Sequence, residues 1–439
     1  MNSELKPTEI LRLDVGRPNT HITTGRFLDV SEERPQDLTI MPMSKSIECS
    51  VSSNSPFDRK SSEVGTVIIV TPGGIDNGGG IGRQMGYFIE ANQHDGTAYR
   101  IVDSRGPWFL GASPFHMGFA GCYLLTAMLK LIVARFSTKP LLVHVNITGR
   151  GSTIRKVIIL IITGLLLKIK YVLHVHDYDY ATEYTRHGEM MKRFISLIFH
   201  RAAKILVLGI RERDALTRLL QLDNSQIAVL HNAVPDPISD VAETRDVGGP
   251  IHILFLGHLS ARKGVPELLQ ALAGPVLRSK QWRATLAGGG PVDEFRSTID
   301  EFAVAERVNF TGWLDEPRVR ALCADADILV LPSHAEGLAM AVLEGLSYGL
   351  AVVTTPVGAH PEVIEPGISG LFVPPGDVDA LAAALQRLID DKDLRRRLGM
   401  AARLRFLEKF DVRAYAERLA QLHRNVLSKQ QSRSENIQS

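Results

Sequence analysis

Two glutamates, Glu336 and Glu344, stand eight residues apart in the segment PSHAEGLAMAVLEGLSYG. A proline and a polar turn precede an apolar run at helical spacing, which predicts a strand (ILVLPS), a loop (HAEG) and then a helix. The free N–H groups at the start of a helix favour an anion such as phosphate. Two carboxylates would repel that phosphate, so they are better suited to accept hydrogen bonds from hydroxyl groups of the same ligand. A nucleotide sugar carries both kinds of group. The alternative interpretation is two surface charges.

A basic turn, GHLSARKG, follows the first predicted strand of the same half of the chain. Arg262 and Lys263 stand where cations could neutralise a diphosphate leaving group. Gly289 lies in a run of three glycines that ends the next strand and allows a ligand to approach the backbone closely. A solvated basic turn is the alternative interpretation.

The first half begins with a strand, a glycine loop from Gly73 to Gly82, and a helix. Such a loop lets backbone N–H groups approach a ligand, and Asp103 after the next strand resembles the acidic ribose partner of a dinucleotide site. No frame of the loop supplies all three glycines of GxGxxG, which disfavours NAD. We expect Gly79 and Gly80 to line the acceptor side of a cleft instead.

His176 and Asp177 end another predicted strand of the first half, where functional groups of α/β sheets collect. Asp177 and Asp179 form a DxD pattern that could hold Mn²⁺ or Mg²⁺. Such patterns are common by chance, and this half lacks the glutamate pair, so no metal site is predicted and Asp177 is assigned to the acceptor side. His176 is predicted to be functional. His174 should point the same way, because side chains two apart in a strand share a face.

Short apolar strands alternate with helices in both halves, which predicts an α/β protein with two parallel sheets facing a central cleft. The first half and the second half are separated by the polar, Pro- and Gly-containing segment DPISDVAETRDVGGP. The predicted divisions are a largely disordered segment at 1–62, an acceptor-side domain at 63–235, a linker at 236–250, a nucleotide-sugar domain at 251–405, and a C-terminal helix with a frayed tail at 406–439.

The composition restricts the partners. A net charge of +2 gives no reason to expect nucleic acid, and three scattered cysteines suggest a reducing compartment without structural zinc. The start of the chain has no apolar signal core. The apolar stretch Val157–Leu167, flanked by Arg155, Lys156, Lys168 and Lys170, is too short to span a bilayer. It is interpreted mainly as a buried helix, with a helix that docks on an anionic membrane as the alternative.

These elements, in this order, resemble the retaining GT-B glycosyltransferases of family four. The resemblance covers roughly Val64 to Asp377 and is strongest from Leu329 onward, across the E-x7-E region. It implies that Glu336 contacts hydroxyls of the donor sugar and Glu344 the ribose. Backbone amides around Gly337 and Leu338 would meet the sugar and the diphosphate.

The resemblance also implies that Lys263 binds the diphosphate and that His176 positions the transferred sugar. HNAVP at 231–235 matches the segment near the interdomain hinge. One position departs from the family: His258 stands where an arginine often contacts the diphosphate. Arg262 could reach the same phosphate from one turn away.

The implied activity is retaining, metal-independent and cofactor-free hexosyl transfer from a UDP-sugar, with GDP as the second choice, to a glycan or lipid-linked acceptor. The expected setting is bacterial surface or exopolysaccharide biosynthesis, in the cytoplasm and at the inner membrane face. Two alternatives stay open: a sugar-nucleotide epimerase of the same architecture, and a nucleotide-sugar-binding protein without turnover, which His258 motivates.

Overall fold

The computed structural model describes residues 65–75, 79–92, 96–105, 114–137, 140–148, 151–237, 249–300, 302 and 304–438. The segment predicted to be disordered, 1–62, lies outside the described residues, as does most of the predicted linker at 236–250. Within the described part, two six-stranded sheets organise the chain.

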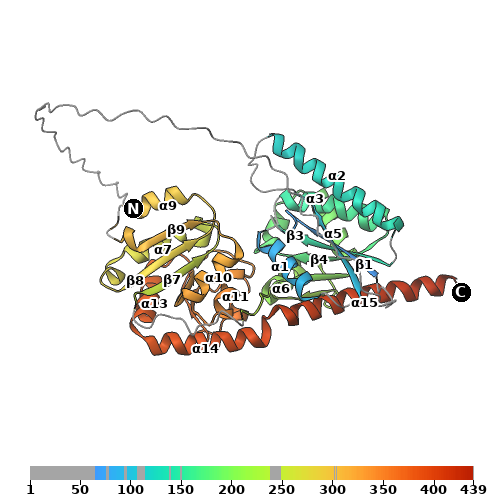
Figure 1. The fold of residues 1–439 in the computed structure, drawn as a ribbon. Coiled ribbons are helices and arrows are strands. Elements are labelled where there is room, and N and C mark those ends of the chain that lie inside the picture. Colours follow the sequence, from blue (N-terminus) through green and yellow to red (C-terminus); the bar gives the residue numbers. More distant parts are fainter. Residues whose placement is uncertain are drawn as a thin grey trace, which may run out of the picture. The chain divides into compact units, whose positions relative to one another are not determined.

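The first sheet has the strand order β2-β1-β3-β4-β5-β6, and all neighbouring strands are parallel (Figure 1). Every residue of β1 and β3 is buried, as expected for central strands that are covered on both faces. The strands are β1 (Gly65–Thr71), β2 (Thr97–Asp103), β3 (Leu141–Ile147), β4 (Lys170–Val175), β5 (Lys204–Val207) and β6 (Ile227–Val229). The helices are α1 (Gly79–Ala91), α2 (Pro114–Ser137), α3 (Gly151–Leu160), the π-helix η2 (Ile161–Leu166), α4 (Tyr180–Thr185), α5 (Glu189–Arg201) and α6 (Ile210–Leu220).

The second sheet has the order β12-β11-β10-β7-β8-β9 and is also parallel. Its strands are β7 (Ile251–Leu256), β8 (Trp282–Ala287), β9 (Val308–Gly312), β10 (Ile328–Leu331), β11 (Ala351–Thr354) and β12 (Leu371–Phe372). Its helices are η3 (Ala261–Lys263), α7 (Val265–Ala273), α8 (Pro275–Arg278), α9 (Val292–Asp300), η4 (Ala305–Arg307), α10 (Glu316–Asp325), α11 (Met340–Ser347), α12 (His360–Val363), α13 (Val378–Asp390) and α14 (Lys392–Lys409).

The strand order reverses once in each sheet, between β1 and β3 in the first and between β7 and β10 in the second. Ligands of open α/β sheets bind outside the carboxyl ends of the strands at such a reversal. The glycine loop follows β1, the basic turn follows β7, and the loop with Glu336 follows β10. The topology therefore places the predicted site residues where a ligand is expected.

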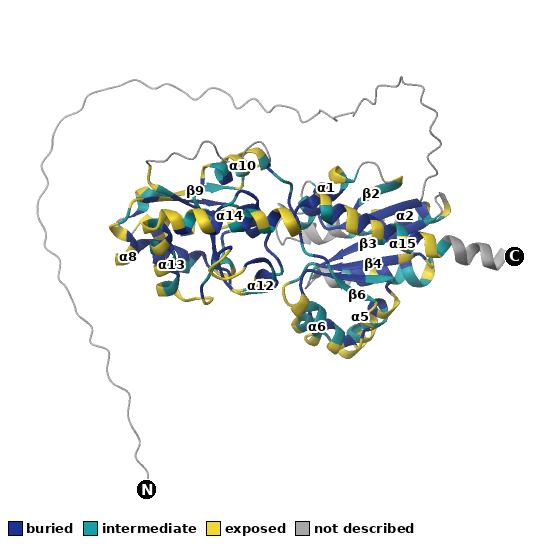
Figure 2. Ribbon diagram, turned by 90° about the horizontal axis from the view of Figure 1, so that it is seen from below, coloured by how far each residue is buried: buried dark blue, intermediate teal, exposed yellow. Residues whose placement is uncertain are grey.

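The last helix, α15 (Val412–Gln438), returns to the first sheet. Val234 N donates to Phe410 O at 3.2 Å and Val412 N donates to Val234 O at 3.0 Å, which joins the segment after β6 to the start of α15. Farther along, α15 packs against α1 and β3. His423 and Leu427 enter a core whose central strands, β3 and β4, are buried throughout most of their length (Figure 2).

Four histidines from β3, the end of β4 and α15 form a stack inside the first half. The ring of His174 lies 4.0 Å from that of His176 and 5.4 Å from that of His144, centroid to centroid. His144 Nδ1 and His423 Nε2 are 2.9 Å apart, so one ring donates and the other accepts. Burial lowers the pKa of all four, that of His144 to about 4 and that of His176 to about 3. The rings are therefore neutral at pH 7.

The buried histidines make stability dependent on pH. Their folded-state pKa values lie below the unfolded value of about 6.5, so the unfolded chain binds more protons once the pH falls below about 6.5. The stabilisation is present above that pH and is lost as the pH falls toward the folded values. Each histidine contributes a slope of about 1.4 kcal/mol per pH unit. Urea unfolding at several pH values between 7.5 and 4.5 measures the loss.

A variant separates this effect from general acid sensitivity. His174→Phe keeps an aromatic ring among the buried histidines but removes one titrating group. Its free energy of unfolding should therefore fall less steeply with decreasing pH, by about 1.4 kcal/mol per pH unit. His200→Gln changes an exposed histidine of α5 and should leave the slope as in the unaltered protein. An unchanged slope in His174→Phe would contradict the prediction.

Candidate active site

Glu336 lies in the loop between β10 and α11, and only 8% of the residue is exposed. Its Oε1 accepts hydrogen bonds from Ser333 Oγ at 2.9 Å and from Arg262 Nη1 at 3.3 Å, and it lies 2.5 Å from Lys263 Nζ. Burial alone would raise the pKa of this carboxyl group, but the charges of Lys263 and Arg262 outweigh burial and lower it. Glu336 is therefore ionised and is held by two cations.

Arg262 and Lys263 are the last two residues of the short 3-10 helix η3 (Ala261–Lys263), which follows β7. Besides contacting Glu336, Arg262 Nη1 donates to Ala335 O at 2.6 Å, and its guanidinium lies 5.5 Å from the centroid of the Tyr178 ring. Stacking on an aromatic ring and bonding to a carbonyl fix the direction of the guanidinium. His258 lies exposed at the start of the same segment.

Gly337 brings the loop of the second half against the end of β4 in the first half. A Cβ atom at this position would lie 2.9 Å from Leu208 Cδ1, and 3.5 and 3.6 Å from the backbone oxygens of Asp177 and His176. The absence of a side chain thus permits the close approach. The structure brings together Glu336, Gly337, His176 and Asp177, which the sequence assigned to one cleft.

His176 is held by Asn146, a residue of β3. His176 Nε2 and Asn146 Oδ1 are 2.8 Å apart, and Asn146 Nδ2 donates to Val70 O at 3.4 Å. With the amide in this orientation, Oδ1 is the acceptor and Nε2 of His176 carries the proton. Burial and then repulsion from His144 lower the pKa of His176 to about 3. The neutral ring can therefore donate through Nε2 and accept through Nδ1.

Glu344 lies on α11 and forms an ion pair with Arg83 of α1, with 3.1 Å between Oε1 and Nη2. The carboxylate raises the pKa of Arg83, against the opposing effect of burial. The ribose contact that the family resemblance implies for Glu344 stays a prediction. If it forms, it shares the carboxylate with Arg83.

The remaining predicted residues take supporting positions. Leu338 O accepts a hydrogen bond from Asn232 Nδ2 at 2.9 Å, which ties the loop of Glu336 to the segment HNAVP. In that segment His231 Nε2 lies 2.9 Å from Glu362 Oε2, and Glu362 Oε1 accepts from Ile210 N at 2.6 Å. Glu362 therefore caps the N-terminus of α6 from the other half of the chain.

The glycines of both halves also lie near the site. Gly289 O accepts from Leu259 N at 2.8 Å, so the three-glycine run packs on the basic turn rather than standing alone. A Cβ atom at Gly80 would lie 3.6 Å from Met340 Cγ, and one at Gly79 would meet open space. The start of α1 therefore approaches the start of α11.

The aspartates of the DxD pattern have a local role. Asp177 Oδ1 accepts from Asp179 N at 3.3 Å, and Asp179 Oδ1 accepts from Thr182 N as the N-cap of α4. In the part of the chain that the structure describes, no three His, Cys, Asp or Glu side chains gather as metal ligands. The prediction that no metal takes part stays a prediction.

Sequence reasoning missed four residues that the structure places in or beside the site: Arg83, Asn146, Asn232 and Glu362. Asn146 offered a readable signal, because it is a polar residue at the end of an apolar strand. Arg83 and Glu362 offered none, since each pairs with a residue more than a hundred positions away.

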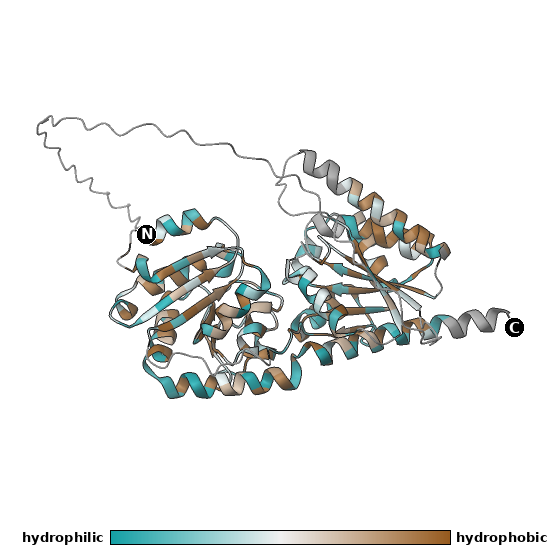
Figure 3. Cartoon of the chain, viewed as in Figure 1, coloured by the Kyte–Doolittle hydropathy of each residue, from teal (hydrophilic) through white to brown (hydrophobic). Residues whose placement is uncertain are grey.

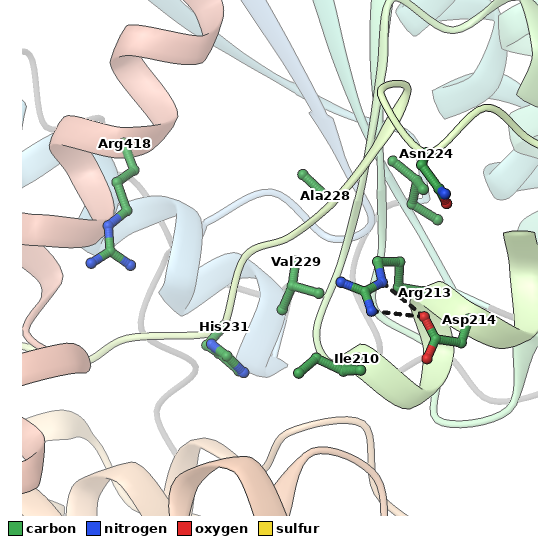
Figure 4. Close-up of a pocket in the computed structure, with 9 residues that line it drawn as sticks. Ile210, Arg213, Asp214, Asn224, Ala228, Val229, His231 and Arg418 are labelled. Atoms are coloured by element: carbon green, nitrogen blue, oxygen red, sulfur yellow. Dashed lines mark hydrogen bonds and ion pairs between the residues drawn. The ribbon is translucent and has the colours of Figure 1, made fainter.

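A separate hollow of about 640 Å³ lies between β6, α6 and α15, where Arg213 pairs with Asp214 (Figure 4). His231 and Arg418 reach it from the segment HNAVP and from α15. None of the predicted donor-site residues lines it, so we assign it no role in the site.

Residues 240–405 match the family described as Glycosyl transferases group 1. A glycogen synthase of Mycobacterium tuberculosis is 31% identical over 258 residues, which are 56% of this chain and 61% of that enzyme. The chain thus spans less than two thirds of the length of that relative.

Two solved structures have a similar fold. Sucrose-phosphate synthase from Thermosynechococcus elongatus superposes with a TM-score of 0.66 at 21% identity, covering 83% of this chain and 99% of that one. HepE of Anabaena, in complex with UDP-glucose, gives a TM-score of 0.63 at 18% identity, covering 82% and 99%. These likenesses confirm the predicted fold class.

The packing beneath the Glu336 loop generates a prediction. Gly358 has a φ of +54°, and a Cβ there would lie 2.0 Å from Glu336 O and 2.3 Å from Gly337 O. Gly358→Ala must therefore move the backbone of the loop, in addition to straining its own φ. We expect it to lower the free energy of unfolding by about 2 kcal/mol more than a glycine replacement that strains φ alone.

Gly367→Ala is the matched control, because Gly367 has a φ of +75° but a Cβ atom there would have no neighbour within 4 Å. It should cost only the left-handed backbone penalty of about 1–2 kcal/mol. Urea unfolding of both variants compares the two costs, and equal losses would show that the loop does not depend on Gly358.

Proposed function

The chain belongs to the glycosyl transferases group 1 family and has the GT-B fold, and from this premise we propose that it is a retaining glycosyltransferase. It moves a sugar from a nucleotide-diphosphate sugar to an acceptor hydroxyl. The observation that carries the proposal is the ionised Glu336, held between Lys263 and Arg262 and followed by Gly337, which packs against the end of β4 at His176.

The proposed donor is a UDP-sugar, with a GDP-sugar as the second choice. A solved structure of similar fold contains UDP-glucose. In the proposal Glu336 accepts hydrogen bonds from sugar hydroxyls and Glu344 from the ribose, while backbone amides of Gly337 and Leu338 meet the sugar and the diphosphate. His258 and Gly289 flank the diphosphate.

The proposed reaction breaks the bond between the anomeric carbon and the β-phosphate oxygen and forms a bond from that carbon to the acceptor oxygen on the same face. The acceptor proton passes to the departing phosphate oxygen. Negative charge grows on the leaving group, so Lys263 and Arg262 contribute most by stabilising it. His176, neutral and fixed by Asn146, positions the sugar through a hydrogen bond.

The proposed acceptor is a glycan or a lipid-linked sugar, in the synthesis of a bacterial surface polysaccharide or exopolysaccharide at the cytoplasmic face of the membrane. The glycine loop with Gly79 and Gly80, together with Asp177, forms the acceptor side in this proposal.

Lys263→Ala tests the proposal. It removes the cation closest to Glu336, and we expect kcat for release of UDP from a UDP-sugar in the presence of acceptor to fall at least about 100-fold, the size of effect seen when one oxyanion-stabilising donor is lost. The assay measures UDP release across a panel of UDP- and GDP-sugars.

Lys280→Ala is the control, because Lys280 pairs at 2.7 Å with Asp390 on the surface and neither residue is a predicted site residue; its activity should stay within about twofold. Isomerised nucleotide sugar without acceptor would indicate an epimerase. Binding of UDP without any turnover would indicate a binding protein. A Lys263→Ala enzyme as active as the control would remove the proposed mechanism.

We also propose that helix α2 brings the protein to a membrane. Leu125, Leu129, Val133 and Phe136 are exposed by 59, 62, 62 and 80%, and their helical spacing puts them on one face of α2. Figure 3 colours much of the described part of this helix as hydrophobic. A contiguous exposed apolar stripe marks an interaction surface. In the described part of the chain, no helix has the length and apolarity needed to cross a bilayer.

The charge around this stripe favours an anionic lipid surface as the partner. Residues 104–176 contain nine Lys and Arg and no Asp or Glu. Lys130 is exposed beside the stripe, and Lys168 and Lys170 are exposed beyond η2, whose end is tied to α2 by a hydrogen bond from Arg135 Nε to Leu167 O at 3.1 Å. Lys156, predicted to flank a docking helix, is instead fully buried. Apolar insertion and basic flanks together suit interfacial binding.

Leu129→Glu places a charge in the stripe and should reduce co-sedimentation with phosphatidylglycerol vesicles at least fivefold. The expected reason is the cost of burying a carboxylate among anionic headgroups. Leu404→Glu is the control, since Leu404 is 63% exposed on α14, outside the stripe. Binding of the unaltered protein should weaken at high salt. Failure of the unaltered protein to sediment with these vesicles would refute the membrane proposal.

A further inference from the structure

Helix α1 of the first half packs with one face against the start of α11 in the second half. A Cβ atom at Gly80 would lie 3.6 Å from Met340 Cγ. One turn farther along both helices, Arg83 Nη2 lies 3.1 Å from Glu344 Oε1. Residues three or four apart in a helix share a face, so the ion pair continues the contact that Gly80 begins. The packing of the two helices therefore fixes where Arg83 meets Glu344.

The carboxylate of Glu344 is largely removed from water. Only 11% of its side chain is exposed, and every residue of α11 is buried. An ionised carboxylate in such a place needs a counter-charge or hydrogen-bond donors. Arg83 supplies the counter-charge, and its planar guanidinium holds a bonded carboxylate in a more definite direction than a flexible ammonium group would.

The residue after Arg83 ties α1 down from a second side. Gln84 is fully buried, and its Oε1 accepts a hydrogen bond from Ala233 N at 2.9 Å. Ala233 belongs to the segment HNAVP, whose Asn232 donates to Leu338 O at 2.9 Å, just before α11. The same segment thus contacts both helices, and the ion pair between them is part of a packed arrangement rather than a surface pair.

The ion pair leaves the carboxylate able to bind a ligand. A carboxylate has two oxygens and about four lone-pair positions, and Arg83 approaches Glu344 Oε1 through Nη2. In the proposed function, Glu344 accepts hydrogen bonds from the ribose of the donor. A buried, oriented acceptor rejects a ligand that lacks the matching hydroxyl, because the acceptor is then left unpaired. Arg83 can therefore determine specificity without contacting the nucleotide.

We propose that Arg83 is a positioning residue that directs the carboxylate of Glu344 toward the ribose hydroxyls, and that the protein thereby selects ribonucleotides over deoxyribonucleotides. The inference rests on the proposed function and adds the group that sets its specificity for ribose. If Arg83 only tied α1 to α11, its loss would weaken the binding of ribonucleotides and deoxyribonucleotides equally. The ratio of the two affinities therefore distinguishes a positioning role from a structural one.

The test measures the Kd of the full chain for UDP, 2′-deoxy-UDP and 3′-deoxy-UDP by titration calorimetry, with GDP and its deoxy forms if UDP does not bind. We expect loss of at least one of the two hydroxyls to weaken binding at least about tenfold, the size of one hydrogen bond to a charged group. In Arg83→Met that ratio should fall to about threefold or less, because Glu344 loses its counter-charge and its direction. Arg83→Gln gives the same comparison if Arg83→Met does not fold.

Arg320→Met is the matched control. Arg320 lies on α10 and pairs with Glu316 at 2.7 Å, so its replacement removes a positive charge and an ion pair without touching the pair of Glu344. Its ratio should stay within about twofold of that of the unaltered chain. Glu344→Gln should lose the ratio as Arg83→Met does, since it removes the charge that Arg83 orients.

A chain that binds UDP and both deoxy forms equally would overturn the inference, and so would an Arg83→Met variant that keeps the full ratio. UDP release from a UDP-sugar in the presence of acceptor scores the proposed function separately. Transfer without discrimination at the ribose would refute the role of Arg83 and leave the transferase standing. Discrimination that depends on Arg83, in a chain that transfers no sugar, would refute the transferase and leave the role of Arg83 standing.

Discussion

The ion pair between Glu336 and Lys263 joins the carboxyl ends of β10 and β7, the two neighbouring strands at which the winding of the second sheet reverses. A buried carboxylate without its partner would cost several kcal/mol, so this pair holds the two loops in one arrangement. The rest of the site depends on that arrangement. Gly358 packs directly against the backbone of the Glu336 loop, and Gly337 lets that loop lie against the end of β4. In the proposed function, a donor that bonds to Glu336 would meet a carboxylate already ionised and oriented.

Much of the fold and part of the site could be predicted from the sequence, because short local sequence patterns indicate both. Short apolar strands between helices gave both parallel sheets, and Glu336 and Lys263 stand in motifs a few residues long. Arg83 and Glu362 could not be found this way, since their partners are distant in the chain. The burial of Lys156 could not be predicted from the sequence either. A lysine beside an apolar helix is expected to be solvated, and only the fold brings Ser104 against it.

The histidine stack shows how a residue of the site is fixed by the core behind it. His176 contacts Asn146 on one side and the His174 ring on the other, and the row continues through His144 to His423 of α15. Each ring is neutral because an imidazolium at any of these positions would be buried away from water and would lie close to the other rings. The orientation of His176 therefore depends on a helix that begins at the end of the second half of the chain.

The excess of basic residues in the first half indicates the kind of partner that this half binds. In the proposed function the donor phosphates meet Lys263 and Arg262 of the second half, so donor binding gives no reason for nine basic residues and no acidic one between 104 and 176. Within that acid-free segment Lys156 is fully buried, whereas Lys130, Lys168 and Lys170 are exposed on α2 and beyond η2. Self-repulsion in such a segment is unfavourable unless anions balance it from outside. An anionic lipid surface would balance the exposed cations beside the apolar stripe of α2.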